Sequence, residues 1–237
     1  MATIETYAKP TWLYRYRSLR QRGEEDNARA DSARLAREID ALIEGYIHCS
    51  TYNQMNDPME GFFRANPGGT GGDDEDDFFA AVRNEKMGLG IASLSETWDN
   101  ELMWAHYAAG FRGICVTYPT ARLLSGLDQH HALSRVAYSE RPHYLGLKDL
   151  RNRDERARAV LSAKSLKWAY EREWRLFSPQ PGRACHGSRG ATTVYLGMRM
   201  AVEDRRTIRR QLKGTGIAVR RTLVDGYSLK CLAARRT

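Results

Sequence analysis

Stretches with the two-residue period of a β-strand alternate with helical stretches along most of the chain. In "WLYRYRSL", an aromatic residue at every second position alternates with Leu13, Arg15 and Arg17, which predicts a strand. In "ARLAREIDALIEG", the apolar residues are instead spaced three or four apart, which predicts a helix that Gly45 ends. "YIHCS" then predicts a short strand, and "NDPMEG" predicts a turn.

The alternation continues through the rest of the chain, without a repeat of fixed period. Four more helices are expected: one that the loop "GGTGG" leads into, in "DDEDDFFAAVRNEKMG", one in "DNELMWAHYAAG", capped by Asp99 or Asn100, a long one from about Lys148 to Lys167, and a basic one in "VEDRRTIRRQLKG". Further strands are expected in "LGIASLSE", "GICVTYP", "LSRVAYSE", "EWRLFSP", "TVYLGMR", "IAVRRTL" and "YSLKCL". We therefore expect residues 1–237 to form one α+β domain with a mixed, mainly antiparallel sheet as its core.

Several classes of protein are disfavoured by what the sequence lacks. It has no run of 18 apolar residues, and "MATIETYAKPTW" has no signal-peptide pattern, so we expect a cytoplasmic protein without a membrane partner. The four cysteines form no CxxC pair, so neither a zinc site nor a disulfide framework is expected. "GGTGG" is followed by the acidic run Asp73–Asp77, which would repel phosphate and which suits a helix start better than a metal site. No metal is expected.

Positive charge is concentrated in the C-terminal part of the chain. Residues 199–237 hold eleven Lys and Arg against three Asp and Glu, an excess of eight that equals the net charge of the whole chain. Two interpretations stay open. One is a solvated helix face around Ile208 and Leu212; the other is a surface for nucleic acid or another polyanion. In the second interpretation, the contact residues are Arg205, Arg206, Arg209 and Arg210.

The segment "YEREWRL" (residues 170–176) carries two glutamates two positions apart. If it is a strand, Glu171, Glu173 and Arg175 share one face. The carboxylates could then form a salt-bridge ladder with the arginines of "LYRYRS", a structural role. Alternatively, Glu173 and Glu171 could be catalytic, because paired carboxylates stabilise a developing positive charge and act as general bases.

Six motifs stand in the order of a widespread bacterial family: "LYRYRS", "HCSTYNQMNDPMEG", "SLSETWDNELMWAHYA", "GICVTY", "VAYSE" and "KWAYEREWRL". The chain resembles the family catalogued as domain of unknown function 2971 from about Leu13 to Leu176. Its members typically read LYKYR, FNDPFE, MWxHY and ExEWR in the corresponding places. His48 and Cys49 depart from this pattern, because relatives usually have an aromatic residue and a serine there. The family name implies no activity.

A second resemblance, at the level of the fold, suggests one. "GYIHCS" is similar to a segment of small proteins with the ADP-ribosyltransferase fold. That superfamily uses a basic residue on an early strand, then a His, Ser or Tyr, then a late glutamate. Arg15 and Arg17, then His48 and Ser50, then Glu171 and Glu173 would fill these roles in order. His106 and Tyr107 of "MWAHY" are further candidate ligand contacts, although an aromatic stripe at helical spacing is more often part of a core.

These resemblances imply an NAD-consuming, ADP-ribosyltransferase-like enzyme, with NAD as its substrate and a protein or nucleic acid as acceptor. Arginine forks would bind the pyrophosphate of NAD, and Glu173 would stabilise the charge that develops on its ribose. A bacterial toxin or phage-defence effector would fit, with an antitoxin or immunity protein as partner. The alternatives are a nucleic-acid-binding or nucleic-acid-cleaving defence component, and a non-catalytic interaction domain.

Overall fold

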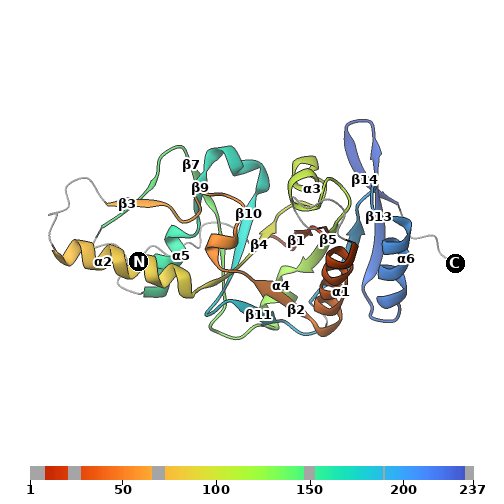
Figure 1. The fold of residues 1–237 in the computed structure, drawn as a ribbon, viewed down its shortest axis with the longest axis horizontal. Helices are drawn as coiled ribbons and strands as arrows, with labels where there is room; N and C mark the ends of the chain where they lie inside the picture. The colour runs from red at the N-terminus through yellow and green to blue at the C-terminus, as the bar shows by residue number, and fades with distance from the viewer. Residues whose placement is uncertain (1–8, 21–27, 66–72, 147–152, 189, 233–237) are drawn as a thin grey trace. The chain divides into compact units, whose positions relative to one another are not determined.

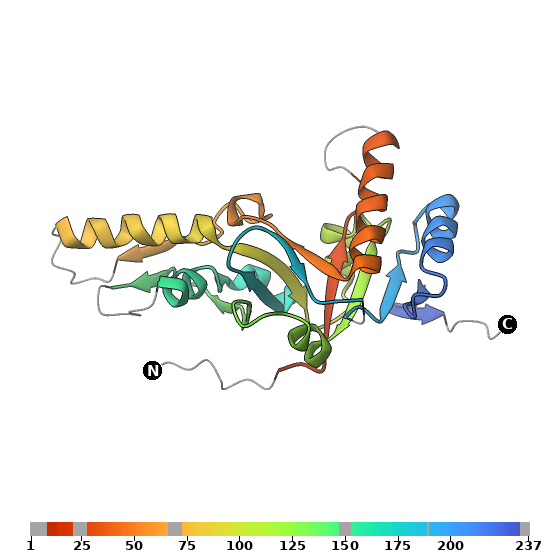
Figure 2. The ribbon, with the colours of Figure 1, turned by 90° about the horizontal axis from the view of Figure 1, so that it is seen from below.

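Figures 1 and 2 show a computed structural model of the protein. It describes residues 9–20, 28–65, 73–146, 153–188 and 190–232. Contacts within the chain divide it into two compact units. Unit 1 comprises Met1–Ile47, Leu94–Asp128 and Cys185–Thr237, and unit 2 comprises His48–Ser93 and Gln129–Ala184. The chain passes between the units within β2 (Tyr46–Cys49), β4 (Gly90–Ser95) and β11 (Gly182–Cys185), and once more between Asp128 and Gln129.

Unit 1 is built on a sheet of the order β14-β13-β12-β5-β1. Its strands are β1 (Trp12–Arg17), β5 (Ile114–Pro119), β12 (Thr193–Leu196), β13 (Ala218–Asp225) and β14 (Ser228–Leu232). Neighbouring strands run antiparallel except β12 and β13, which are parallel. β1 also pairs antiparallel with the end of β4, at Tyr14 and Ser95. The prediction of a mainly antiparallel sheet is therefore confirmed, together with the α+β class.

The helices of unit 1 are α1 (Ala28–Glu44), α3 (Glu101–Tyr107), α4 (Thr120–Ser125) and α6 (Val202–Gln211). Gly45 ends α1 with a φ of 75°, a left-handed conformation that only glycine adopts without strain. Of the two caps considered for α3, Asn100 is the one used, because its side chain accepts hydrogen bonds from the backbone N–H groups of Leu102 and Met103. No helix of the described residues is long and apolar enough to cross a membrane.

Unit 2 carries the antiparallel pair β6–β10, with β4 beside β10. Its other strands form two parallel pairs, β3–β8 and β7–β9. The bounds are β3 (Phe63–Ala65), α2 (Asp73–Gly88), β6 (Ala132–Arg135), β7 (Ala137–Ser139), β8 (His143–Leu145), α5 (Arg153–Val160), β9 (Ala163–Ser165) and β10 (Glu173–Ser178), with 3₁₀ helices at Tyr52–Gln54 and Leu166–Glu171.

A buried cluster of apolar side chains holds unit 2 together. Leu89 and Ile91 pack with Ala157, Leu161 and Phe177, which joins α5 to the strands β4 and β10. Every residue of β10 is buried, so charged side chains on this strand lie inside the unit and must be neutralised there.

Two expectations for this region are corrected. The stretch from Lys148 to Lys167 is not one long helix, because α5 ends at Val160 and β9 follows. Pairing of β9 with β7, far away in sequence, overrides the local preference. "LSRVAYSE" forms two short strands, interrupted at Val136. "GGTGG" lies outside the described residues, and so do the side chains of residues 73–75 in the acidic run.

Candidate functional site

The two glutamates do not lie on one strand, contrary to the prediction. Glu171 is the last residue of the 3₁₀ helix Leu166–Glu171, and β10 begins at Glu173. Between them, Arg172 has a φ of 46°, in the left-handed region that non-glycine residues rarely adopt. This turn of the backbone, and not a strand period, sets the relative position of the two carboxylates.

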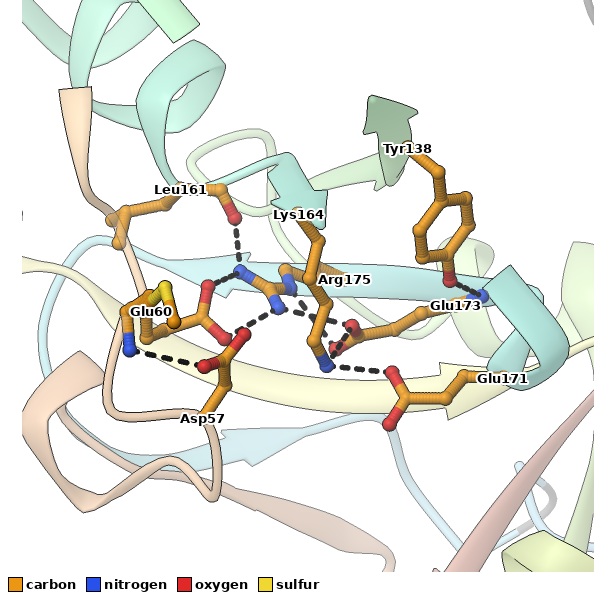
Figure 3. A network of polar contacts seen from close by, with 9 residues as sticks. Asp57, Glu60, Tyr138, Leu161, Lys164, Glu171, Glu173 and Arg175 are labelled. Atoms are coloured by element: carbon orange, nitrogen blue, oxygen red, sulfur yellow. Dashed lines mark hydrogen bonds and ion pairs between the residues drawn. The ribbon is translucent and has the colours of Figure 1, made fainter. Parts of the chain in front are cut away.

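Arg175 is the centre of the polar network drawn in Figure 3. Its Nε and Nη2 atoms each donate to a different oxygen of Glu173, both at 2.9 Å. Nη1 and Nη2 donate to the two oxygens of Glu60 at 2.6 and 2.9 Å, and Nη1 also donates to the carbonyl oxygen of Leu161. These contacts use all five N–H groups of the guanidinium. The side chain is fully buried. Its charge is accommodated inside unit 2 because every N–H group of the guanidinium has a hydrogen-bond acceptor.

Lys164 joins the two glutamates to each other. Its Nζ lies 2.6 Å from Glu171 Oε2 and 3.3 Å from Glu173 Oε2. The same ammonium lies 4.9 Å from the centre of the Trp168 ring, a cation–π distance. The side chains of Lys164, Glu171 and Glu173 are each exposed by 5% or less. We call Glu60, Lys164, Glu171, Glu173 and Arg175 the buried charge cluster.

The electrostatics of the cluster keep Glu173 ionised. Burial by itself raises the pKa of this carboxyl, but Arg175 and Lys164 outweigh burial and hold the pKa at about 2. Burial also lowers the pKa of Lys164, and the attraction of Glu173 and Glu171 raises it above the usual value. Glu173 and Lys164 are therefore both charged at neutral pH.

Three further hydrogen bonds fix the cluster in place. The backbone N–H of Glu173 donates to the hydroxyl oxygen of Tyr138 at 2.8 Å. Asp57 accepts a hydrogen bond from the backbone N–H of Met59, and its carbonyl oxygen accepts one from the N–H of Glu60. Asp57 thus closes the turn that presents Glu60 to Arg175, as Figure 3 shows, and this agrees with the turn predicted for "NDPMEG".

The same turn is held from α2 by a buried lysine. Lys86 donates to the carbonyl oxygen of Gly61 at 2.7 Å and lies over the rings of Tyr52 and Phe63, at 4.7 and 5.3 Å. Burial lowers the pKa of this amine. Its contacts orient the segment that carries Glu60, so we assign it a structural role.

The arginines predicted to bind pyrophosphate lie on β1, in unit 1. Arg15 is buried. Arg17 donates from Nε and Nη2 to Glu38 of α1, at 2.8 and 2.5 Å. The fork of Arg17 is therefore bound to a carboxylate of the protein itself, while the cations beside the glutamates are Arg175 and Lys164 of unit 2.

The remaining predicted ligand contacts belong to different units. In unit 2, His48 is exposed on β2, and the backbone of Ser50 exchanges hydrogen bonds with Ile91. In unit 1, His106 is exposed near the end of α3, with its ring 6.3 Å from that of Tyr107. Of the predicted site residues, the structure thus brings Glu171 together with Glu173 in unit 2, and His106 together with Tyr107 in unit 1.

The four arginines predicted to contact nucleic acid lie on α6 in unit 1. Arg205 and Arg209 are four residues apart, as are Arg206 and Arg210, so they follow adjacent rows along the helix. Ile208 is the buried apolar residue of this helix. Except for Arg205, which is partly buried, these arginines are exposed.

A fifth arginine extends this surface onto the sheet. Burial lowers the pKa of Arg205, and the charges of Arg221 on β13 and of Arg209 lower it further. Arg221 therefore lies close to the arginines of α6. We call Arg205, Arg206, Arg209, Arg210 and Arg221 the basic face. No ion pair found among the described residues involves any of them.

Sequence reasoning missed the partners of the glutamates. Glu60 lies 115 residues before Arg175, and Lys164 falls in the stretch that was expected to be helical. A buried arginine needs more than one carboxylate to use its five N–H donors. Glu60, the acidic residue of the predicted turn, could therefore have been considered as a second partner of Arg175. In the described part of the chain, no group of three or more His, Cys, Asp or Glu side chains could hold a metal ion.

Comparison with protein families gives a match over part of the chain. Residues 103–176 match the family described as "Protein of unknown function (DUF2971)". The matched segment runs from within α3 to within β10 and so contains all of "MWAHY" and all of "EREWRL". No curated protein and no solved structure matches the chain. The predicted resemblance to the family of domain of unknown function 2971 is therefore confirmed over residues 103–176.

Proposed function

We propose that the protein binds nucleic acid through the basic face of unit 1. One observation supports this most directly: five arginines gather on α6 and β13, and no ion pair found among the described residues involves them, although Glu203 of α6 attracts Arg205. Exposed guanidinium groups of this kind make bidentate contacts with phosphate oxygens. Such contacts position a nucleic acid without reading its sequence.

The spacing of these arginines is unfavourable for the isolated helix. Like charges four residues apart destabilise a helix, and here they form two such pairs, Arg205 with Arg209 and Arg206 with Arg210. Arg221 adds to the repulsion at Arg205. A bound polyanion would relieve this repulsion, so the arrangement is better suited to a ligand than to stability.

The test is the salt dependence of binding to fluorescently labelled 20-mer RNA and DNA. Each phosphate neutralised contributes about −0.7 to −0.9 to the slope of log K against log salt. With four contacts, affinity should fall by roughly 10²-fold between 50 and 200 mM NaCl. Changing Arg205, Arg206, Arg209 and Arg210 to Gln should weaken binding and remove most of this slope.

The matched control changes four other exposed arginines to Gln: Arg37, Arg112, Arg122 and Arg141. It removes the same net charge, so its affinity and slope should stay close to those of the wild type if the basic face is the contact surface. Equal losses in the two variants would mean that net charge alone attracts the nucleic acid. Absence of binding at 50 mM salt would refute the proposal.

A second proposal keeps the expected chemistry of NAD. It is favoured by one observation, that Glu171 and Glu173 meet at the same ammonium while Glu173 stays ionised. An ionised carboxylate next to ribose would stabilise the positive charge that develops as nicotinamide leaves. Because the cluster is buried, substrate would need a local opening of unit 2 to reach it.

The test of this second proposal is nicotinamide release from NAD by the wild-type protein, with and without a bacterial lysate as a source of acceptors. Turnover by the wild type, reduced about 10²-fold or more in Glu173→Gln, would support it. A folded wild type without turnover would assign the glutamates to the structure of unit 2.

A further inference from the structure

The hairpin of β13 and β14 ends in a two-residue turn, Gly226 and Tyr227. Gly226 has a φ of 61°, as the first central residue of a tight hairpin turn often requires. Tyr227 follows it and is the most exposed of the large hydrophobic side chains that the structure describes. In Figure 1, this hairpin extends past the end of α6. An aromatic ring is thus held in solvent at the tip of a short ribbon.

The hairpin that carries Tyr227 also carries one arginine of the basic face. Arg221 of the basic face lies on β13, four residues before the last residue of that strand, Asp225. A strand rises about 3.4 Å per residue, so the turn lies on the order of 15 Å from Arg221. Near the tip, Lys230 pairs with Asp225 at 2.5 Å, and both side chains are largely exposed. The ring of Tyr227 therefore lies within reach of a chain of phosphates that the basic face holds.

We propose that Tyr227 stacks on an unpaired base of a nucleic acid whose backbone is bound by the basic face. This inference rests on the proposed nucleic-acid binding and adds the class of ligand, which is single-stranded. Phosphate contacts alone do not distinguish single strands from duplexes. A ring at a hairpin tip does, because it can cover the flat face of a base only where that face is not already stacked in a duplex.

The expected chemistry is sequence-tolerant. Every base has a π-face, so stacking on tyrosine adds affinity without selecting one base. The hydroxyl of Tyr227 is not needed for stacking, and phenylalanine should replace it. The basic face should determine how strongly the binding affinity depends on salt. Tyr227 should determine how much more tightly the protein binds a strand that carries bases than an abasic one.

The experiment measures binding of three labelled 20-mers by fluorescence anisotropy: a single-stranded RNA, an abasic strand with the same number of phosphates, and a duplex. Tyr227→Ala should lower affinity for the single strand by about 10- to 100-fold, the range found for losing one stacked base. It should leave the abasic strand and the salt slope unchanged. Tyr227→Phe should retain the affinity of the wild type.

Tyr144→Ala is the matched control, since Tyr144 is another exposed tyrosine but lies on β8 in unit 2. It should bind all three probes as the wild type does. A fourth probe, a vesicle containing anionic lipid, tests the other use of an exposed aromatic tip, which is insertion at a membrane surface.

The outcomes separate the two proposals. If the wild type binds RNA but Tyr227→Ala binds it equally well, or loses affinity for the abasic strand to the same extent, stacking is refuted and the basic face stands. If the wild type binds vesicles through Tyr227 but no nucleic acid, both proposals fail. If no probe binds, the basic face is a solvated helix surface and the inference falls with it.

Discussion

The buried charge cluster of unit 2 and the basic face of unit 1 differ in how their charges are neutralised. In the cluster, Arg175 and Lys164 lie between three glutamates, and Arg175 uses every donor it has. On the basic face, five arginines gather and none of them takes part in an ion pair found among the described residues. Charge inside a protein must be matched by the protein itself, whereas charge at the surface can be left for a ligand. The same residue types thus serve the fold in one place and remain available for binding in the other.

The largest effect should come from Arg175→Met, which removes the charge at the centre of the cluster. Glu60 and Glu173 would then be buried carboxylates without their main partner, and breaking a buried pair in this way costs about 3–5 kcal/mol. Urea denaturation should show this loss, and the Tm should fall by roughly 10 °C. Arg141→Met, at an exposed position, should change stability by less than about 0.5 kcal/mol. A difference between the two variants of under 1 kcal/mol would show that the cluster is not a structural element.

The loss of stability caused by Glu173→Gln should depend on pH. Glu173 has a pKa of about 2 in the folded protein, below the value of about 4.3 expected after unfolding. Its ionised form therefore stabilises the fold above pH ~4.3, and this contribution is lost as the pH falls towards 2. The wild type should exceed Glu173→Gln by on the order of 3 kcal/mol at pH 7 and by little near pH 2. The comparison requires denaturation curves between pH 2 and 7.

Glu140→Gln provides the control for this pH series, because Glu140 is an exposed carboxylate of the same unit. Its stability should follow that of the wild type at every pH. If the wild-type and Glu173→Gln curves instead stay parallel down to pH 2.5, Glu173 does not depend on Arg175 and Lys164 for its charge.

On the basic face, the fourfold change of Arg205, Arg206, Arg209 and Arg210 to Gln should leave stability within about 1 kcal/mol of the wild type. Glutamine is a good helix former, and the change removes two repulsive pairs at four-residue spacing. Circular dichroism and urea denaturation check this, alongside the binding assay. A loss as large as that of Arg175→Met would mean that these arginines have structural partners.

The smallest effect should be that of Arg221→Gln. Removing this charge relieves repulsion at Arg205, so stability should rise by a few tenths of a kcal/mol at low salt, the scale of exposed charge interactions. The gain should vanish at 0.5 M NaCl because salt screens exposed charges. A destabilised variant would place Arg221 in an attractive contact instead.

Local patterns in the sequence predicted much of unit 1. The period of "LYRYRS" located β1, and the apolar spacing before Gly45 located α1 and its end. The basic helix and the two strands after it were found in the same way. These elements were predictable because the residues that determine them lie within a few positions of one another.

The candidate site in unit 2 depended on contacts that no local pattern contains. The strand expected over "YEREWRL" is interrupted at Arg172, whose left-handed backbone is unusual for arginine. β9 replaced the end of an expected helix because β7 was there to pair with it. Glu60 meets Arg175 across 115 residues. Tertiary packing decided each of these features. Glu171 and Glu173 were predicted to lie at one site because a continuous strand was assumed, and that assumption was wrong.

The bond between Arg175 and Glu60 has a consequence for how this sequence can change over time. Loss of Arg175 alone leaves Glu60 as a buried carboxylate without its cation, and loss of Glu60 alone leaves two donors of Arg175 without an acceptor. Loss of both removes the unpaired charge of Glu60 but still deprives Glu173 of Arg175, so the double variant should be less destabilised than the sum of the single variants. The two positions should therefore vary together among relatives, and a double-mutant cycle should return a large coupling energy. The turn at Asp57 and the strand β10 are therefore expected to change together during evolution, although more than a hundred residues separate them in the chain.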